Sequence, residues 1–251
     1  MEILHDTNIN PSNICKKYFA KMKKKGIYHD IINGKYYIIK KNNNELEAKY
    51  TLKIVNAINK ITPDEQIFFV NIRSMIKCNK NYIYIMENIE LPELRYIYIL
   101  LNKKWRSIFL LQSLVSIFIL NHTIGYYHND LYYKNDIRNI MINNQDIRDD
   151  FYFDNIKIPT SYFCTVMIDF GWSSQDFGFR TKEYHEKYFA NNKFVSEVLI
   201  FAYIYFIKTQ PINSELIFEQ SLKISDMVDS RMEYDREIIK FVYSKIKKYL
   251  D

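Results

Sequence analysis

Glycine and proline are scarce in this sequence, which has five of each among 251 residues. Tight turns must therefore be built largely from Asn and Asp, which tolerate turn geometry. A glycine-rich loop around phosphate groups also has little to be built from, because no G-x-G-x-x-G run occurs and only Gly26 and Gly34 precede residue 100. The sequence predicts that such a loop is shortened, replaced or absent.

Cysteine is also rare, and Cys15, Cys78 and Cys164 lie far apart without forming a C-x-x-C pair. This spacing predicts neither a disulfide framework nor a clustered zinc site, and it favours a reducing compartment. The N-terminal residues contain no long apolar core of the kind found in a signal peptide. We therefore expect an intracellular, cytoplasmic protein.

No uninterrupted apolar run reaches the ~18 residues that a membrane-spanning helix needs. Residues 107 to 127 are interrupted by Gln112 and Asn121, and residues 194 to 207 contain Glu197. We expect both stretches to form buried core helices and predict no membrane span.

Basic residues are in moderate excess, with a net charge of +6, and part of that charge lies in the run KKYFAKMKKK at residues 16 to 25. Such a run is typical of the solvated face of an N-terminal helix, or of an attachment site for an acidic partner. It supplies no base-reading chemistry, so we do not expect nucleic acid as the partner.

Strand and helix signals divide the first 90 residues. Asn33-Gly34 between apolar runs predicts a hairpin of two antiparallel strands. The Asn residues at 42 to 44 can cap a helix from about Glu45 to Lys60. The runs at 67 to 78 and 81 to 87 predict a second strand pair.

Long helical patterns begin near Leu91, and the apolar helix among them ends near Gly125. Short strands are expected at residues 139 to 142 and 165 to 168, and the chain from about Asn192 is mostly helical. The order is a small strand-rich lobe, a connector near residues 87 to 92, and a helix-rich lobe. A nucleotide could bind in the cleft between two such lobes.

Two runs carry the residues with chemical potential: HNDLYYKNDIRNIMI at 128 to 142 and VMIDFG at 166 to 171. Asp130 follows the long apolar helix, and Asp169 ends a short strand. Phosphoryl transfer requires a metal ion that neutralises phosphate oxygens and a carboxylate that orients the attacking hydroxyl. Two fixed Asp residues on neighbouring loops supply both needs.

The ordered pair of runs resembles the catalytic core of the protein-kinase superfamily. The resemblance covers roughly residues 35 to 206. It implies an α+β, two-lobed fold with a small strand-rich N-lobe and a reduced helical C-lobe, and it implies ATP and Mg²⁺ as cofactors. Asp130 would accept or orient the proton of the substrate hydroxyl, and Asp169 would hold magnesium.

The same resemblance implies a second metal ligand and a cation near the phosphate. Asn135 has the family's spacing from Asp130, whereas Asn139 has the position before a strand, and the sequence leaves both open. Lys134 is placed to meet phosphate or substrate, while Tyr132 stands where many serine/threonine kinases have Lys.

Two further positions of this loop have implied structural roles. His128 would pack against the Asp-Phe-Gly segment rather than act as a base. Asn129 replaces the Arg that pairs with a phosphorylated activation loop in the family, which argues against that form of switching.

In the small lobe, Lys40 resembles the strand Lys that contacts nucleotide phosphates, with Lys41 as the adjacent alternative. Its implied ion-pair partner is a Glu on the following helix, with Glu47 as first choice and Glu45 as second. The connector, through Glu87 and Asn88, would hydrogen-bond adenine with its backbone.

Departures from the family pattern are concentrated outside the catalytic core. No A-P-E triplet follows Gly171, and the helix near residue 194 offers Ser196 and Glu197 in place of an early Asp. The chain looks similar to compact kinases of large DNA viruses. We expect a basic segment at residues 1–26, an N-lobe at 27–90 and a C-lobe at 91–251.

The function that the resemblance implies is transfer of the ATP γ-phosphate to a protein hydroxyl, on Ser or Thr. A small-molecule phosphotransferase similar to the aminoglycoside and choline kinases is one alternative, although Gly171 of the D-F-G run favours the protein-kinase side. The other alternative is a pseudokinase that binds partners without catalysis, which the missing glycine loop supports.

Overall fold

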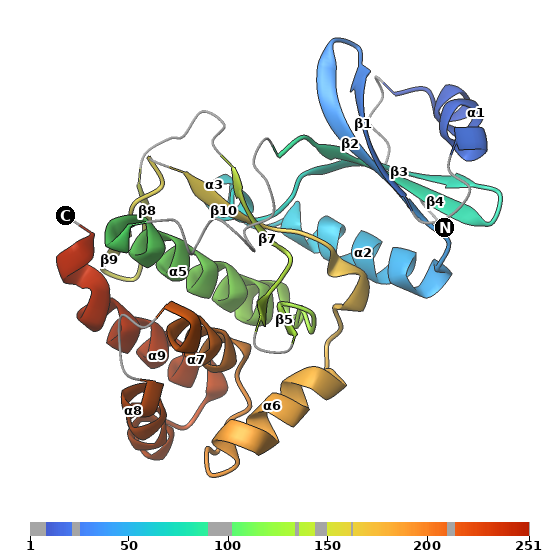
Figure 1. Cartoon of the computed structure of the whole chain (residues 1–251). Helices are drawn as coiled ribbons and strands as arrows, with labels where there is room; N and C mark the ends of the chain where they lie inside the picture. The colour runs from blue at the N-terminus through green and yellow to red at the C-terminus, as the bar shows by residue number, and fades with distance from the viewer. Residues whose placement is uncertain are drawn as a thin grey trace.

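The computed structural model describes residues 9–21, 26–89, 102–133, 136–143, 150–161, 163–209 and 214–250. Within them, a strand-rich part and a helical part lie at opposite ends of the molecule (Figure 1). The strand-rich part comes from the first 89 residues, and the helical part begins at residue 103.

A four-stranded antiparallel sheet forms the strand-rich part, in the order β1-β2-β4-β3. Its strands are β1 (Gly26–Ile32), β2 (Lys35–Asn42), β3 (Ile72–Cys78) and β4 (Asn81–Glu87). The turn between β1 and β2 has positive φ at Asn33 and Gly34, 53° and 79°, which these two residue types tolerate best. The hairpin and the second strand pair predicted from the sequence are confirmed.

Helices cover both faces of this sheet. Helix α1 (Pro11–Lys21) packs Ile14 and Tyr18 against one face, where Ile39 and Ile85 are buried. Helix α2 (Glu45–Ile58) buries Ala48 and Ile54 in the main core. Apolar side chains on both faces explain why β3 and β4 read as nearly continuous apolar runs.

The Asn cap predicted for α2 is confirmed, because the side chain of Asn44 accepts the backbone N–H groups of Leu46 and Glu47. A short helix, α3 (Pro63–Gln66), follows and is capped by Thr62. Together α2 and α3 lead the chain back to the start of β3.

The prediction that the cysteines stay unpaired was wrong. Cys15 of α1 and Cys78 of β3, which are 63 positions apart in the sequence, form a disulfide with Cα atoms 5.5 Å apart. Spacing along the chain could not show this pairing, because it arises from the packing of α1 on the sheet. The cysteine content therefore gives no support for a reducing compartment, and the intracellular location stays a prediction without it.

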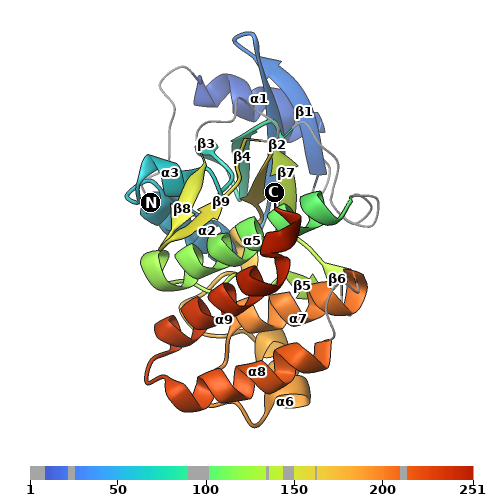
Figure 2. The same ribbon diagram turned by 90° about the vertical axis from the view of Figure 1, so that its left-hand side faces the viewer.

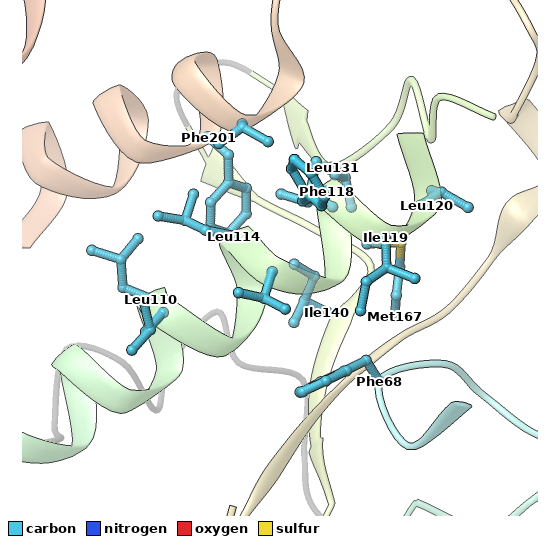
Figure 3. Close-up of a cluster of buried hydrophobic side chains, with 14 of the residues drawn as sticks. Phe68, Leu110, Leu114, Phe118, Ile119, Leu120, Leu131, Ile140, Met167 and Phe201 are labelled. Carbon is cyan, nitrogen blue, oxygen red and sulfur yellow. The ribbon is translucent and has the colours of Figure 1, made fainter. Parts of the chain in front are cut away.

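The helical part is organised around α5 (Lys103–Phe118), which continues as a π-helical segment (Ile119–Ile124) and ends at Gly125. Gly125 has a φ of 81°, the left-handed conformation that ends many helices. Figure 3 shows Leu110, Leu114 and Phe118 of α5 packed with Phe201 and Ile140. The predicted helix end near Gly125 is confirmed.

Two long helices, α7 (Glu197–Thr209) and α9 (Arg231–Ile246), pack with α5, and α8 (Ser214–Met227) packs against α7 and α9 (Figure 2). A 3₁₀ turn (Lys247–Tyr249) ends the described chain. The segment Lys103–Ile124 is long and apolar enough to cross a membrane, but 83% of its most apolar window is buried inside the protein. Burial of this extent is that of a core helix, and the two apolar stretches are buried helices as expected.

Short strands connect α5 to α7. Strands β7 (Ile140–Asn143) and β10 (Cys164–Met167) pair antiparallel, as the sequence predicts. Two other short pairs are β5 (Tyr132–Tyr133) with β6 (Asp136–Ile137), and β8 (Phe151–Phe153) with β9 (Ile156–Ile158). A 3₁₀ turn (Phe170–Trp172) and α6 (Phe179–Phe189) follow β10. The β8–β9 hairpin and α6 were not anticipated.

Candidate active site

A cavity of about 580 Å³ opens between the sheet and the β7–β10 pair. Its lining comes mainly from β1, β2, β4, β7 and the residues after β10, among them Ile38, Lys40, Met141 and Asp169. Of the expected site residues, Lys40, Asn88 and Asp169 line this cavity.

Lys40 is the charged centre of this cavity. Its Nζ lies 2.6 Å from Asp169 Oδ1 and 4.0 Å from Glu47 Oε1. The alternatives lie elsewhere: Lys41 is buried and does not line the cavity, and Glu45 pairs with Lys49 at 3.4 Å. The structure thus brings together the first choices of the sequence analysis, Lys40 and Glu47.

Asp169 and Gly171 lie in the tight turn that follows β10. Asp169 has φ 60° and ψ 62°, in the left-handed region, which turns its side chain toward Lys40. A Cβ atom at Gly171 would lie 2.3 Å from Glu47 Cγ. Only glycine allows α2 to approach this closely, so Gly171 helps Glu47 reach Lys40.

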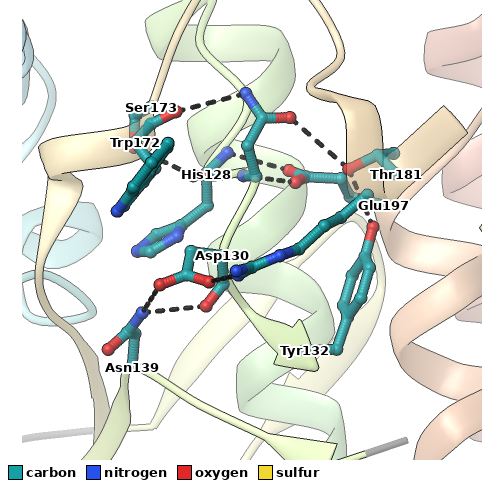
Figure 4. A network of polar contacts seen from close by, with 10 residues as sticks. His128, Asp130, Tyr132, Asn139, Trp172, Ser173, Thr181 and Glu197 are labelled. Carbon is teal, nitrogen blue, oxygen red and sulfur yellow. Dashed lines mark hydrogen bonds and ion pairs between the residues drawn. The ribbon is translucent and has the colours of Figure 1, made fainter. Parts of the chain in front are cut away.

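Asp130 lies in the loop of residues 127–133, which we call the Asp130 loop. Asn139 Nδ2 donates to the backbone oxygen of Asp130 at 2.8 Å and to its Oδ2 at 3.2 Å (Figure 4). The backbone oxygen of Asn139 accepts from Ile168 N at 2.9 Å. Asn139 therefore joins Asp130 to the end of β10, while Lys134 and Asn135 lie outside the described residues.

Glu197, the first residue of α7, holds the Asp130 loop in place. Its two carboxylate oxygens accept the backbone N–H groups of His128 at 3.0 Å and Asn129 at 2.8 Å (Figure 4). Glu197 is fully buried, and burial raises its pKa to about 7 against the lowering effect of these bonds. Sequence reasoning noted Glu197 only as a departure from the expected Asp.

His128 is buried under the same loop. Its Nε2 lies 2.8 Å from the backbone oxygen of Ile168, and its ring lies 5.6 Å from that of Phe170. Burial lowers the pKa of His128, so the ring is neutral at physiological pH. These contacts are those of a packing residue.

Asn129 binds the segment of residues 172–178, which we call the clamped segment. Its Nδ2 donates to Ser174 Oγ at 3.0 Å and to the backbone oxygen of Asp176 at 3.1 Å, and its Oδ1 accepts from Gly178 N at 2.6 Å. A neutral amide thus orders the segment without a phosphate group.

Aromatic stacking supports the other side of the clamped segment. The rings of Phe177 and Tyr127 stack at 3.9 Å. The guanidinium of Arg231, from α9, lies 4.8 Å from the Tyr127 ring and 5.1 Å from the Phe177 ring. Cation–π contacts of this kind are worth about 0.5 to 2 kcal/mol, so the stack adds to the amide bonds.

The connector residues have different surroundings. Asn88 lines the cavity, next to Ile89. The side chain of Glu87 pairs with Arg73 on the surface, and its backbone N–H donates to Asn71 O at 3.0 Å. The side chain of Glu87 is thus engaged away from the cavity.

The ligand set suits magnesium. Within the described residues, no group of three His, Cys, Asp or Glu could hold a metal ion by itself. Magnesium at a phosphoryl-transfer site takes only one or two protein oxygens, because substrate phosphates and water supply the rest. Asp169 offers a carboxylate, and Asn139 turns its Nδ2 to Asp130, which leaves its amide oxygen on the other side (Figure 4).

Two contacts from α6 were missed by the sequence analysis. Arg180 Nη1 contacts Asp130 Oδ1 directly, and Tyr132 Oη donates to Thr181 Oγ1 at 3.0 Å. Both join residues about fifty positions apart, and no local signal in the sequence indicates them.

Comparison with known proteins supports the fold but not a closer relationship. No family model matches the sequence, and no curated protein matches it. Among solved structures, the chain is similar to the crystal structure of the BubR1 kinase domain, at 13% identity and a TM-score of 0.53. The match covers 91% of this chain and 81% of that one. The chain therefore has a kinase-like fold with an antiparallel sheet and helices.

Proposed function

We propose that the protein is a protein kinase that uses ATP and Mg²⁺ to phosphorylate a serine or threonine hydroxyl of a protein substrate. The sheet and the helical part would be its two lobes, with the nucleotide between them. The contact of Lys40 with both Asp169 and Glu47 at the wall of the cavity carries this proposal.

The residues divide the work of binding. Lys40 would contact nucleotide phosphates, and Glu47 would orient its ammonium group. Asp169 and Asn139 would hold magnesium, which neutralises charge on the phosphate oxygens when bound. The backbone of Glu87 and Asn88 would hydrogen-bond the adenine ring through groups other than the Glu87 N–H, which donates to Asn71 O.

Asp130 would act on the acceptor. Its carboxylate orients the substrate hydroxyl and receives its proton, the hydroxyl oxygen bonds to the γ-phosphorus, and the bond from that phosphorus to the bridging oxygen breaks to release ADP. Asn139 and the Asp130 loop hold this carboxylate in place before substrate binds.

The test is transfer of labelled γ-phosphate from ATP to a mixed protein substrate with magnesium. Asp169→Asn and Asp130→Ala should each lower the rate by about 10²-fold to 10⁴-fold. Asp229→Asn is the matched control, because Asp229 is fully exposed and is distant in the sequence from both Asp130 and Asp169. Phosphoamino-acid analysis of the product reports the acceptor, and a panel of aminoglycosides and choline tests the small-molecule alternative.

A pseudokinase is the second candidate, and one observation favours it. Strand β1 is an edge strand, and within the described residues no strand pairs with its outer side, while α1 lies against a face of the sheet. The phosphates would then have little cover. If no phosphate is transferred and ATP with magnesium does not change the melting temperature, the pseudokinase remains as the proposed function.

One further proposal concerns a partner of α1. The exposed Lys16 of α1, with the basic run that follows, would bind an acidic partner. Lys17 is engaged with Asp30 at 2.6 Å, so it is less suited to that role.

A further inference from the structure

Arg180 reaches the carboxylate of Asp130 from the first turn of α6. Its Nη1 contacts Asp130 Oδ1, while Asn139 Nδ2 donates to the other oxygen, Oδ2, at 3.2 Å. The side chain of Asp130 is 14% exposed and that of Arg180 is 36% exposed. A permanent cation therefore lies beside the proposed base.

The residues on both sides of Arg180 are fixed to the Asp130 loop. Two positions before it, Gly178 N donates to Asn129 Oδ1 at 2.6 Å, and a Cβ atom there would lie 2.9 Å from Asn129 Cγ. One position after it, Thr181 Oγ1 accepts from Tyr132 Oη at 3.0 Å (Figure 4). These bonds set the place of Arg180 relative to Asp130.

The ion pair has little reason to exist for stability alone. A partly exposed pair of this kind contributes about 0 to 1 kcal/mol. The arrangement is useful if the cation also stabilises negative charge that arrives next to Asp130.

Phosphoryl transfer brings such charge to this place. The γ-phosphoryl oxygens are anionic and must approach an acceptor hydroxyl that Asp130 contacts, so the carboxylate repels them unless a cation lies between. A guanidinium suits this position, because its planar fork of five N–H donors can contact a carboxylate and a phosphoryl oxygen at once. Residues 127–133 of the Asp130 loop contain no Lys or Arg, and Lys134, which follows them, lies outside the described residues.

We propose that Arg180 is the phosphoryl-binding cation of the transfer site, supplied by α6 instead of by the loop position that Tyr132 occupies. Arg180 contacts an oxygen of the γ-phosphoryl group as the hydroxyl oxygen bonds to phosphorus and the bond to the bridging oxygen breaks. The hydroxyl proton goes to Asp130, and ADP leaves. This inference rests on the proposed kinase function.

The experiment compares Arg180→Ala and Arg180→Lys with Lys182→Ala. Lys182 is an exposed cation on the same helix, so its removal makes the same change of net charge. Arg180→Ala should lower kcat by about 10²-fold or more, as loss of one transition-state contact does, with little change in KM for ATP. Arg180→Lys should retain part of the rate, and added guanidinium chloride at millimolar concentration should restore part of it to Arg180→Ala.

A binding readout separates the role of Arg180 from activity. ADP with magnesium and aluminium fluoride imitates the transferring phosphoryl group, so it should raise the melting temperature of the natural chain more than ADP and magnesium do. Arg180→Ala should lose this extra shift and keep the shift due to ADP. Lys182→Ala should keep both.

Each outcome decides between the proposals. If the natural chain transfers no phosphate and its melting temperature does not change with nucleotide, the kinase function and this inference are overturned together. An active natural chain with Arg180→Ala at the same rate overturns the inference alone. A faster Arg180→Ala variant also overturns it, because Arg180 would then block Asp130. Failure of guanidinium and of Arg180→Lys to restore any rate, with the aluminium fluoride shift intact, would reduce Arg180 to a structural residue.

Discussion

The floor and the roof of the cavity differ in what holds them. We call residues 168–170, which line the cavity, together with the adjoining Asp130 loop and Asn139 the floor. Its polar groups are fixed by partners from α2, α6 and α7. The roof is the β1–β2 hairpin, which presents Ile27 and His29 to the cavity from an edge strand. It is stabilised by apolar packing against α1 and by the contacts of Asp30 with Lys17 and Tyr18, and the disulfide joins α1 to β3.

If the protein is the kinase proposed above, this difference predicts that its chemistry and its nucleotide retention are separable. Polar groups that are already oriented cost little to reorganise during a reaction, so floor substitutions should change kcat. An open apolar strand contributes only contact area, so roof substitutions should change KM for ATP. The four predictions below test that separation.

Loss of the disulfide should have the largest effect on stability, and it should have little effect on the arrangement of the floor. For a cross-link that spans 63 residues, removal should lower the free energy of unfolding by about 2 to 4 kcal/mol. Cys78→Ser and the natural chain treated with dithiothreitol should unfold at the same reduced denaturant midpoint. Cys164→Ser is the control: Cys164 is free, so that variant should still respond to dithiothreitol. A natural chain that ignores dithiothreitol would contradict the prediction.

Glu47→Gln tests the floor from its α2 side. The change keeps the side-chain volume beside Gly171 but removes the charge 4.0 Å from Lys40 Nζ. We expect kcat/KM to fall by about 10-fold to 100-fold, or ~1.4 to 2.7 kcal/mol. Glu45→Gln, on the exposed side of the same helix, should leave it unchanged. Equal rates for the two variants would mean that the Lys40–Glu47 pair does not serve the reaction.

Glu197→Gln tests how the Asp130 loop is supported. Because the folded-state pKa of Glu197 is raised to about 7 from 4.5, the folded chain binds a proton that the unfolded chain has lost between these pH values. The stability of the natural chain that depends on this group is present at low pH and is lost as the pH rises through about 7.

Chemical unfolding between pH 5 and pH 8 should therefore show a flatter pH dependence for Glu197→Gln than for the natural chain. Loss of one acceptor for the buried N–H groups of His128 and Asn129 should also cost about 1 to 3 kcal/mol at low pH. His128, whose pKa is lowered by burial, acts in the opposite direction but is common to both proteins. Parallel pH curves would contradict the assignment of the raised pKa.

Local signals in the sequence were enough for part of this fold and site. Asn33-Gly34 predicted the hairpin, Asn44 the start of α2, and the D-F-G run the position of Asp169, because each depends on a few neighbouring residues. The resemblance also gave Lys40 as first choice and Lys41 as the alternative, and Lys40 lines the cavity with Ile38, because side chains two positions apart share one face of a strand.

Contacts between distant segments were not accessible in this way. The Cys15–Cys78 bond, the Glu197 contact with the Asp130 loop and the Arg180–Asp130 pair join residues 50 to 69 positions apart. Each depends on how helices pack, which no spacing rule specifies. Even the helix α6 that carries Arg180 was missed, because its sequence is largely polar.

Ile27→Ala should give the smallest effect, confined to nucleotide binding. Ile27 lines the cavity and is 64% exposed, so a bound nucleotide would cover a side chain that now faces water. Truncation should raise KM for ATP about 3-fold to 10-fold, or ~1 kcal/mol, with kcat unchanged. Ile31→Ala is the control, because Ile31 points the same way along β1 and does not line the cavity. A fall in kcat for Ile27→Ala would show that the roof also positions the phosphates, and the separation between roof and floor would fail.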